Sequence, residues 1–226
     1  TVYLALTRFD VYGSRDPGDR SHIFVSHSLD RGRSFTAPVR VSDISGDALD
    51  SDDTLEGAVP AVGINGEVFL VWSGASHLFF DRSDDGGWTW GDDRIIQETP
   101  GGWDIEVEGL ARHNGMPVTG VDHSEGPSRG TLYVNWIDER HGDPDVFLIS
   151  SSDGGMSWSN PVRVNDDTMG NGAAQMFTWM AVDSFDGSVN VVFYDRRALD
   201  GTLTQLTLAR SVDGGRTFIN LSLIHI

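Results

Sequence analysis

Arginine and acidic side chains cluster directly after apolar runs of this 226-residue chain. Residues 136–140 read Trp-Ile-Asp-Glu-Arg, residues 193–197 read Phe-Tyr-Asp-Arg-Arg, and Arg8 and Asp10 follow a third run. A guanidinium group is a planar fork that binds a carboxylate through two parallel hydrogen bonds. Because the Asp-x-Arg spacing recurs, ion pairs that build each repeat are the simpler explanation, and recognition of a ligand is the alternative.

Two further carboxylates, Glu106 and Glu108, lie in residues 101–109, a segment with no counterpart in the other repeats. Loops that are not repeated are common places for binding and catalysis, although a solvated loop explains the same residues equally well. We therefore treat this insertion as a candidate site.

Residues 43–56 form an acid-rich loop with the oxygen ligands that Ca²⁺ prefers. The loop lacks the spacing and the central glycine of a helix-loop-helix calcium site, so a solvated acidic loop is the preferred interpretation and calcium the less favoured one. No other cofactor is predicted.

Three motifs are set aside. Residues 126–130, Gly-Pro-Ser-Arg-Gly, spell a nucleophile elbow, but that motif requires a preceding strand and a following helix, whereas an apolar strand-like run follows here. Residues 170–175 begin like a dinucleotide loop but lack its third glycine. The seven histidines show no zinc spacing, and the chain has no cysteine.

An eight-residue pattern, Ser-x-Asp-x-Gly-x-Ser/Thr-aromatic, occurs four times, beginning at residues 28, 83, 151 and 211. A four-position pattern that recurs four times indicates an internal structural repeat. The fixed positions are Ser28, Asp30, Gly32 and Phe35; Ser83, Asp85, Gly87 and Trp90; Ser151, Asp153, Gly155 and Trp158; and Ser211, Asp213, Gly215 and Phe218.

Short runs rich in Val, Phe, Tyr and Thr precede each copy, such as residues 131–136 and 145–150 before the third. They predict antiparallel strands, because Gly, Asp and Asn interrupt them and no helical period is sustained. A further apolar run opens the later repeats, at 59–62, 117–121 and 179–182. Four strands per repeat predict the blades of a β-propeller.

The predicted fold is therefore all-β, a partial antiparallel propeller of about four four-stranded blades from a six- or seven-bladed ring. We expect the blades at residues 1–43, 44–100, 101–166 and 167–220. The eight-residue pattern must turn the chain between the third and fourth strands, with glycine supplying the backbone angles and Ser and Asp binding backbone N–H groups. The closing aromatic residue fills the gap between sheets.

This pattern resembles the Asp-box, or bacterial neuraminidase (BNR) repeat, of the sialidase superfamily, and the resemblance covers residues 1–220. Similar boxes occur in sialidase propellers, in xyloglucan-hydrolysing propellers and in sortilin-type receptors, so the box identifies the fold better than the reaction. In sialidases the boxes lie on the face away from the active site. The resemblance therefore directs attention to the loops at the other face.

The resemblance also implies roles for individual residues. Sialidases bind the sugar carboxylate with three arginines from different blades, and the candidates here are Arg8, Arg140 and Arg197. The Phe-Arg-Ile-Pro segment that marks the first arginine in that family does not occur in this chain.

Sialidases also use a tyrosine nucleophile assisted by a glutamate, and an aspartate as acid and base. Tyr194 with Glu108, or with Glu106, is the candidate nucleophile pair, and Asp138 is the candidate acid/base. These assignments follow from the resemblance only.

The leading hypothesis is a sialidase-like exo-glycosidase that hydrolyses terminal sugars of glycoconjugates. One alternative is a non-catalytic propeller module of a secreted or cell-surface protein that binds carbohydrate or protein, for which grooves lined by Trp103 and Trp179 would be suited. Another is a xyloglucanase-like hydrolase, which needs two facing carboxylates instead of an arginine cluster.

The composition of the chain restricts the classes of partner that it can bind. There are 16 Lys+Arg against 34 Asp+Glu, a net charge of −18, and this acidic field opposes nucleic-acid binding. Hydrophobic residues make up 38%, enough for a core, while no apolar run reaches the roughly 18 residues that span a membrane. No signal peptide is visible in the sequence, so an extracellular or cell-surface location is implied only by the resemblance.

Both ends of the sequence suggest a fragment. Thr1 already lies in a strand-like run, and residues 221–226, Leu-Ser-Leu-Ile-His-Ile, match one reading frame of a sequencing-library adapter. We expect these last six residues to be a non-native tail.

Overall fold

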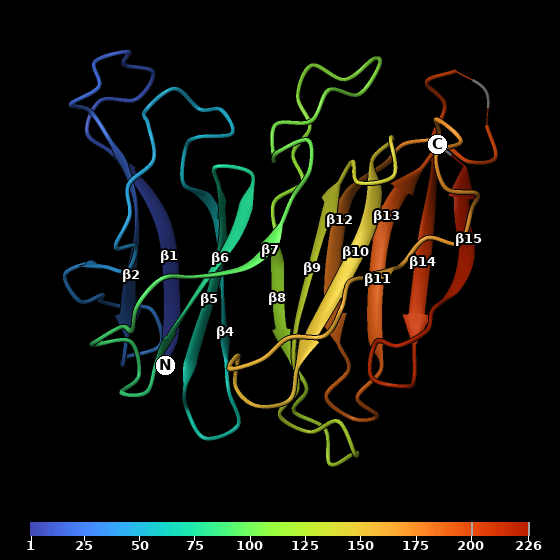
Figure 1. Cartoon of the computed structure of the whole chain (residues 1–226). Helices are drawn as coiled ribbons and strands as arrows, with labels where there is room; N and C mark the ends of the chain where they lie inside the picture. The colour runs from blue at the N-terminus through green and yellow to red at the C-terminus, as the bar shows by residue number, and fades with distance from the viewer. Residues whose placement is uncertain (200, 226) are drawn as a thin grey trace. The chain divides into compact units, whose positions relative to one another are not determined.

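The computed structural model describes residues 1–199 and 201–225, and side chains up to residue 221. Fifteen strands form four antiparallel sheets in this part of the chain, which contains no helix (Figure 1). The predicted all-β fold class is confirmed. The chain divides into two compact units, Thr1–Glu98 and Thr99–Ile226.

The first unit holds a three-stranded and a four-stranded sheet. Its strands are β1 (Val2–Phe9), β2 (Ser21–Ser28) and β3 (Val39–Arg40) in the first sheet, and β4 (Glu56–Val62), β5 (Val68–Gly74), β6 (His77–Ser83) and β7 (Arg94–Glu98) in the second. The first sheet has three strands, one fewer than the four predicted for each blade. Ile23 and Val25 from β2 pack with Trp72 from β5 in the core of this unit.

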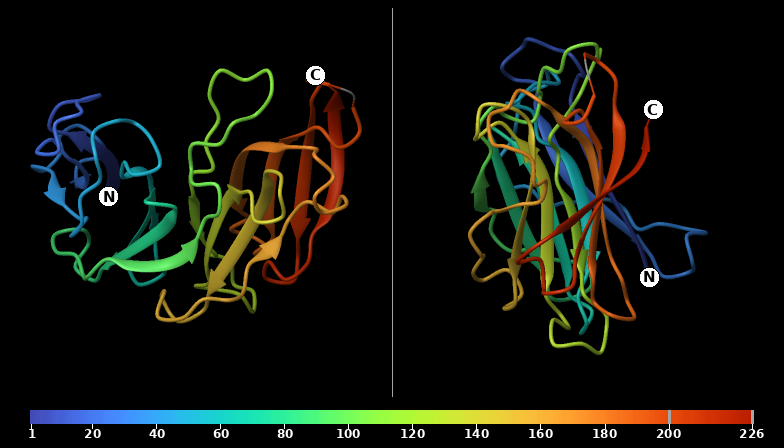
Figure 2. Two further views of the ribbon diagram at one scale, coloured as in Figure 1. Left: turned by 45° about the horizontal axis from the view of Figure 1, so that its top comes forward. Right: turned by 90° about the vertical axis from the view of Figure 1, so that its right-hand side faces the viewer.

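The second unit holds two four-stranded sheets. Its strands are β8 (Val118–Val121), β9 (Leu132–Asp138), β10 (Asp145–Ser151) and β11 (Val162–Arg163) in the third sheet, and β12 (Gln175–Val182), β13 (Val189–Asp195), β14 (Gln205–Ser211) and β15 (Ile219–His225) in the fourth. Strands of each sheet follow one another in chain order, and Figure 2 shows them from two further directions.

Alternating side chains of the third and fourth sheets build the core of the second unit. Ile137 and Leu148 from the third sheet join Met180, Val191 and Phe193 from the fourth in one buried cluster. Each sheet thus covers one face of its neighbour within a unit, which is how propeller blades bury their apolar faces.

β15 includes residues 221–225 of the expected adapter tail, and Ile226 lies outside the described residues. β15 pairs with β14, but this pairing does not test whether the segment is non-native. The non-native origin of the tail and the expected blade limits therefore stay predictions.

The four copies of the eight-residue pattern form the same turn after β2, β6, β10 and β14, and we call these the box turns. In the third box turn the Ser151 hydroxyl donates to Asp153 (2.7 Å) and accepts the Gly155 N–H (2.8 Å). The Ser157 hydroxyl and N–H hold the pKa of Asp153 at about 2. Gly155 has φ 85°, a left-handed conformation that glycine adopts without strain.

Candidate functional site

The strands of the second unit have two different ends. Asp138 pairs with Asp145 at the hairpin between β9 and β10, whereas Leu132 pairs with Ser151 beside the box turn. The hairpin between β13 and β14 lies at the same end as the first hairpin (Figure 1). We call these the hairpin end and the box end.

Residues 99–117, which contain the insertion at 101–109, are fixed to the hairpin end. Glu139 donates its N–H to Pro100 O (2.9 Å), and Arg196 donates to Glu108 O (2.8 Å). Ile105 is buried in the core cluster of the unit, and Trp103 is only 2% exposed. Trp103 is therefore part of the interior and does not line a groove, contrary to the sequence-based suggestion.

His113 fastens the other end of the insertion to β12. Its Nε2 accepts the Phe177 N–H (3.4 Å), and its ring meets the Phe177 ring edge-on at 5.1 Å. Phe177 lies where the register of β12 shifts, with φ 49°. Burial lowers the pKa of His113 to about 4, so the imidazole is neutral at neutral pH.

A cavity of about 700 Å³ opens at the hairpin end between the insertion and the two hairpins. We call it the hairpin-end cavity. Its charged lining residues are Glu106, Glu108, Glu139, Asp143, Arg196 and Arg197. A concave site of this size with converging polar groups has the dimensions of a small-molecule site.

The Glu139 carboxyl group lines this cavity, and its pKa is raised. Burial raises its pKa, and the negative charges of Asp138, Asp143 and Glu106 raise it further. A carboxyl group of this kind can hold a proton and release it to a substrate.

Two buried polar groups at the cavity are incompletely satisfied. Asp143 accepts the Gly172 N–H through Oδ2 (2.7 Å), while its Oδ1 has no partner. Arg196 is 9% exposed and its Nε also has no partner. Buried polar atoms are almost always hydrogen-bonded, so such exceptions indicate groups available to a ligand.

Asp138 and Arg140 bind one another. Asp138 is fully buried and accepts hydrogen bonds from the Arg140 guanidinium (2.5 Å to Nη2) and from Trp136 Nε1 (2.7 Å). The guanidinium also lies 4.5 Å from the centre of the Phe147 ring. In this arrangement the pair holds the hairpin in place.

Arg197 repeats that pairing and also reaches the cavity. It pairs with Asp195 (2.6 Å) and with Asp166, and it lines the hairpin-end cavity together with Glu106 and Glu108. Arg197, Glu106 and Glu108, three of the predicted site residues, therefore line the same cavity.

Arg8 and Tyr194 lie elsewhere. Arg8 belongs to β1 in the first unit, with its guanidinium 5.5 Å from the centre of the Phe24 ring. Tyr194 is 37% exposed on β13 and meets the Phe177 ring edge-on at 5.9 Å, and it is not among the described residues that line the hairpin-end cavity.

The sequence comparison of the two hairpins overlooked the middle position of each Asp-x-Arg pattern. Glu139 and Arg196 occupy that position, and both line the cavity. The outer positions repeat because they form ion pairs inside each hairpin, whereas the middle position differs because it faces the cavity. This difference was the signal that could have identified both residues.

Among the described residues no group of three or more His, Cys, Asp or Glu side chains is placed to hold a metal ion. In the acid-rich loop, Asp47 accepts hydrogen bonds from Leu49 N–H (3.1 Å) and the Thr54 hydroxyl (2.8 Å). No helix in the described part of the chain has the length and apolar character to cross a membrane.

Neither protein-family models nor curated protein sequences give a match to this chain. Several solved structures are similar to it. An intramolecular trans-sialidase from Ruminococcus gnavus is 13% identical with a TM-score of 0.65, and the match covers 98% of this chain and 68% of that one. A Hadza microbial sialidase is 18% identical with a TM-score of 0.59, with 99% and 44% covered.

An α-L-arabinofuranosidase from Fusarium graminearum is also similar, at 14% identity and a TM-score of 0.53, with 78% of this chain and 50% of that one covered. The chain thus spans half or less of the length of two of these three proteins. Identities this low establish the architecture and not the reaction. Together with the four antiparallel sheets, they show that this chain has the partial β-propeller fold of the sialidase-like glycosidases.

Proposed function

We propose that this chain carries the sugar-binding site of a sialidase-like exo-glycosidase that hydrolyses terminal sugars of glycoconjugates. The observation that supports this proposal best is the hairpin-end cavity, which combines Glu139, with its raised pKa, with the carboxylates Glu106 and Glu108 and two arginines. Most glycosidases place a protonated and an ionised carboxyl group on either side of the scissile bond, and sialidases replace the second group with a tyrosine nucleophile.

The proposal assigns proton donation to Glu139, which would protonate the leaving glycosidic oxygen. We prefer it to Asp138 because Asp138 already binds Arg140 and Trp136. Glu108, or Glu106, would act as the base, either on water or on the Tyr194 hydroxyl if Tyr194 is the nucleophile. Whether the sugar is cleaved through Tyr194 stays a prediction.

Arg196 and Arg197 would bind an acidic group on the sugar, because both guanidinium groups line the cavity. The three-arginine arrangement of Arg8, Arg140 and Arg197 also stays a prediction, and it requires Arg140 to leave Asp138. An extracellular or cell-surface location would follow from this substrate class.

A second candidate is a non-catalytic carbohydrate-binding module. It is favoured by exposed aromatic side chains on the fourth sheet, where Trp179 is 59% and Phe177 43% exposed. A xyloglucanase-like reaction, with Glu139 and Glu106 as the two carboxyl groups, is the third.

Release of 4-methylumbelliferone from an α-sialoside and from an α-L-arabinofuranoside tests the proposal. We expect hydrolysis by the 226-residue chain and a loss of about a hundredfold in kcat for Glu139→Gln, because one proton-transfer group contributes at least that much. The matched control is Glu125→Gln, whose side chain is 90% exposed at the box end. Sugar binding without hydrolysis would favour the non-catalytic module, and equal losses in both variants would rule out the cavity.

A further inference from the structure

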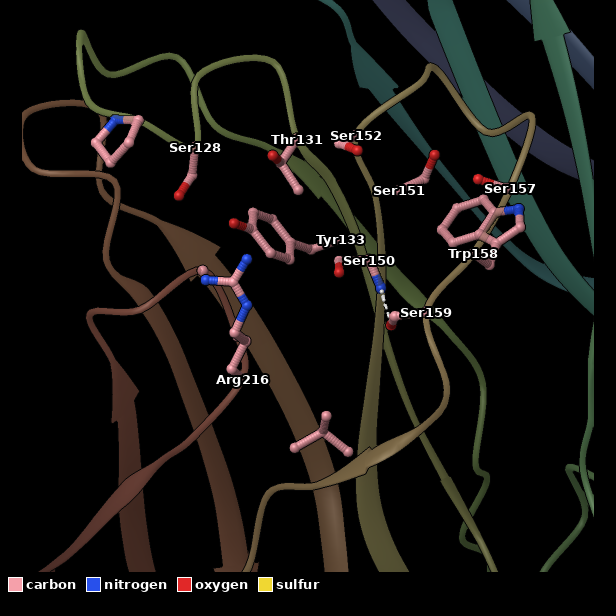
Figure 3. A pocket seen from close by; sticks show the side chains of 14 residues that line it. Ser128, Thr131, Tyr133, Ser150, Ser151, Ser152, Ser157, Trp158, Ser159 and Arg216 are labelled. Carbon is pink, nitrogen blue, oxygen red and sulfur yellow. Dashed lines mark hydrogen bonds between the residues drawn. The ribbon is translucent and has the colours of Figure 1, made fainter.

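A second cavity, of about 480 Å³, lies at the box end of the second unit, far along the strands from the hairpins. We call it the box-end cavity. It lies between the box turns of the third and fourth sheets, and Figure 3 shows the side chains that line it. Hydroxyl groups dominate, from Ser128, Thr131, Tyr133, Ser150, Ser152 and Ser159, with the Trp158 ring at one side.

Two polar groups of the box-end cavity have unused binding capacity. Tyr133 is fully buried and its hydroxyl has no hydrogen-bond partner. Arg216 extends its guanidinium toward that hydroxyl (Figure 3), donates only to Asp213 O (3.3 Å), and forms no ion pair within the described residues. Arg216 is exposed at the edge of the cavity in a chain of net charge −18, so its guanidinium is accessible to an external anion.

The charges around Tyr133 show where that anion belongs. Burial raises the pKa of Tyr133, and the buried Asp122 carboxylate raises it further. The nearby Ser128 and Thr131 hydroxyls and the Arg216 charge lower it. The inner end of the cavity is therefore suited to uncharged hydroxyl groups. The outer end, at Arg216, is suited to an acidic group.

The first unit shows that this cavity is not a general product of the fold. Tyr3 has the same place on β1 that Tyr133 has on β9, but it donates its hydroxyl to Gly86 O (3.1 Å). His27 precedes the first box turn as Ser150 precedes the third, and its ring packs edge-on against Trp88 at 4.5 Å. Trp88 has the box position that Arg216 has in the fourth box turn.

Aromatic rings thus fill the junction in the first unit, whereas Ser150 and Arg216 leave it open in the second. The positions at which the two units differ, those of Ser150 and Arg216, are not the ones whose side chains shape the turn. The serine, aspartate and glycine that shape it are the same in both units.

We propose that the box-end cavity binds an acidic sugar residue of the uronic acid class, separately from the hairpin-end cavity. Serine, threonine and tyrosine hydroxyls both donate and accept, which matches the hydroxyl groups of a sugar. Arg216 binds the carboxylate as a fork, and Trp158 offers an apolar ring to the sugar's C–H face.

This site binds its ligand without cleaving it. Two carboxylates of the adjoining box turns, Asp153 and Asp213, are held by hydroxyl and N–H donors, and the pKa of each is about 2. Neither can hold a proton for transfer at neutral pH. The site would therefore tether a glycan to the propeller.

Calorimetric titration of the 226-residue chain with D-glucuronate and with D-glucose tests the inference, because the two sugars differ in the carboxylate. We expect glucuronate to bind, and glucose to bind at least about tenfold more weakly. Arg216→Gln should weaken glucuronate binding by about tenfold, and Tyr133→Phe by about threefold.

Arg33→Gln is the matched control, since Arg33 has the same box position in the first box turn and lines none of the three described cavities. Its binding should equal that of the unchanged chain. Equal binding of the two sugars, no binding of glucuronate, or an equal loss in Arg33→Gln would each overturn the inference. Glucuronate binding is judged by Arg216→Gln and hydrolysis by Glu139→Gln, so failure here is distinguishable from failure of the proposed hydrolase.

Discussion

The two units use the same box turns but differ in the side chains next to them. In the first unit Tyr3, His27 and Trp88 close the junction between the sheets with rings and one hydrogen bond. In the second unit Tyr133 keeps the position of Tyr3, but Ser150 and Arg216 replace the two rings and the junction is a cavity. The repeated positions therefore specify the blade, and the positions between them specify whether a site exists.

The hairpin end follows the same rule. Asp138 and Arg140 correspond to Asp195 and Arg197 and form ion pairs in both hairpins. The residues between them, Glu139 and Arg196, differ and line the hairpin-end cavity. In both places the variable neighbours of a repeated structural pair line the cavity, joined at the hairpin end by the repeated Arg197.

Filling the box-end cavity with aromatic side chains should abolish the binding of D-glucuronate there. The double substitution Ser150→His and Arg216→Trp places the rings of the first unit into the second and removes the unpaired guanidinium. We expect no detectable binding of D-glucuronate by calorimetry, with the fold retained in circular dichroism, because the turn-forming residues are untouched. Arg33→Trp at the first box turn is the control for adding a tryptophan. Retained binding in the double variant would place the ligand elsewhere.

The units also differ in their response to acid. In the second unit burial lowers the pKa of His113 to about 4 from 6.5, so the unfolded chain takes up a proton at this residue before the folded one does. Stability is then lost as pH falls from 6.5 to about 4, by about 3 kcal/mol in total. His113→Phe removes the titrating imidazole and with it this pH-dependent loss. Urea unfolding at pH 7 and pH 4.5 should show that the free energy of unfolding falls more for the wild-type chain than for the variant.

Asp81 on β6 of the first unit supplies the control for that measurement, because its shift is opposite. Burial raises the pKa of Asp81 to about 6 from 3.8, so the folded chain takes up this proton first and gains stability as pH falls from about 6 to 3.8. Asp81→Asn should therefore lose more stability than the wild-type chain on acidification. The same direction of change in both variants would contradict the assignment of these two residues.

The sequence predicts the sheets and the box turns because both depend on local patterns. Alternating apolar residues define the strands, and Ser-x-Asp-x-Gly closes a turn with its own side chains. The box-end cavity depends instead on the size of Ser150 and the placement of Arg216, which belong to different sheets and meet only after folding. The burial of Trp103 could not be predicted from local sequence patterns either, because it depends on what the insertion packs against.

A pair of single-atom deletions gives the smallest and sharpest comparison. Tyr3→Phe removes a hydroxyl that donates to Gly86 O, and it should lower the free energy of unfolding by about 1 kcal/mol. Tyr133→Phe removes a buried hydroxyl without a partner, and it should change stability by about zero or raise it slightly. Urea unfolding of both variants, beside the unchanged chain, measures the difference. An equal loss in both would mean that Tyr133 already has a hydrogen-bond partner in solution, and the box-end cavity would then lack the buried donor that a sugar hydroxyl is proposed to satisfy.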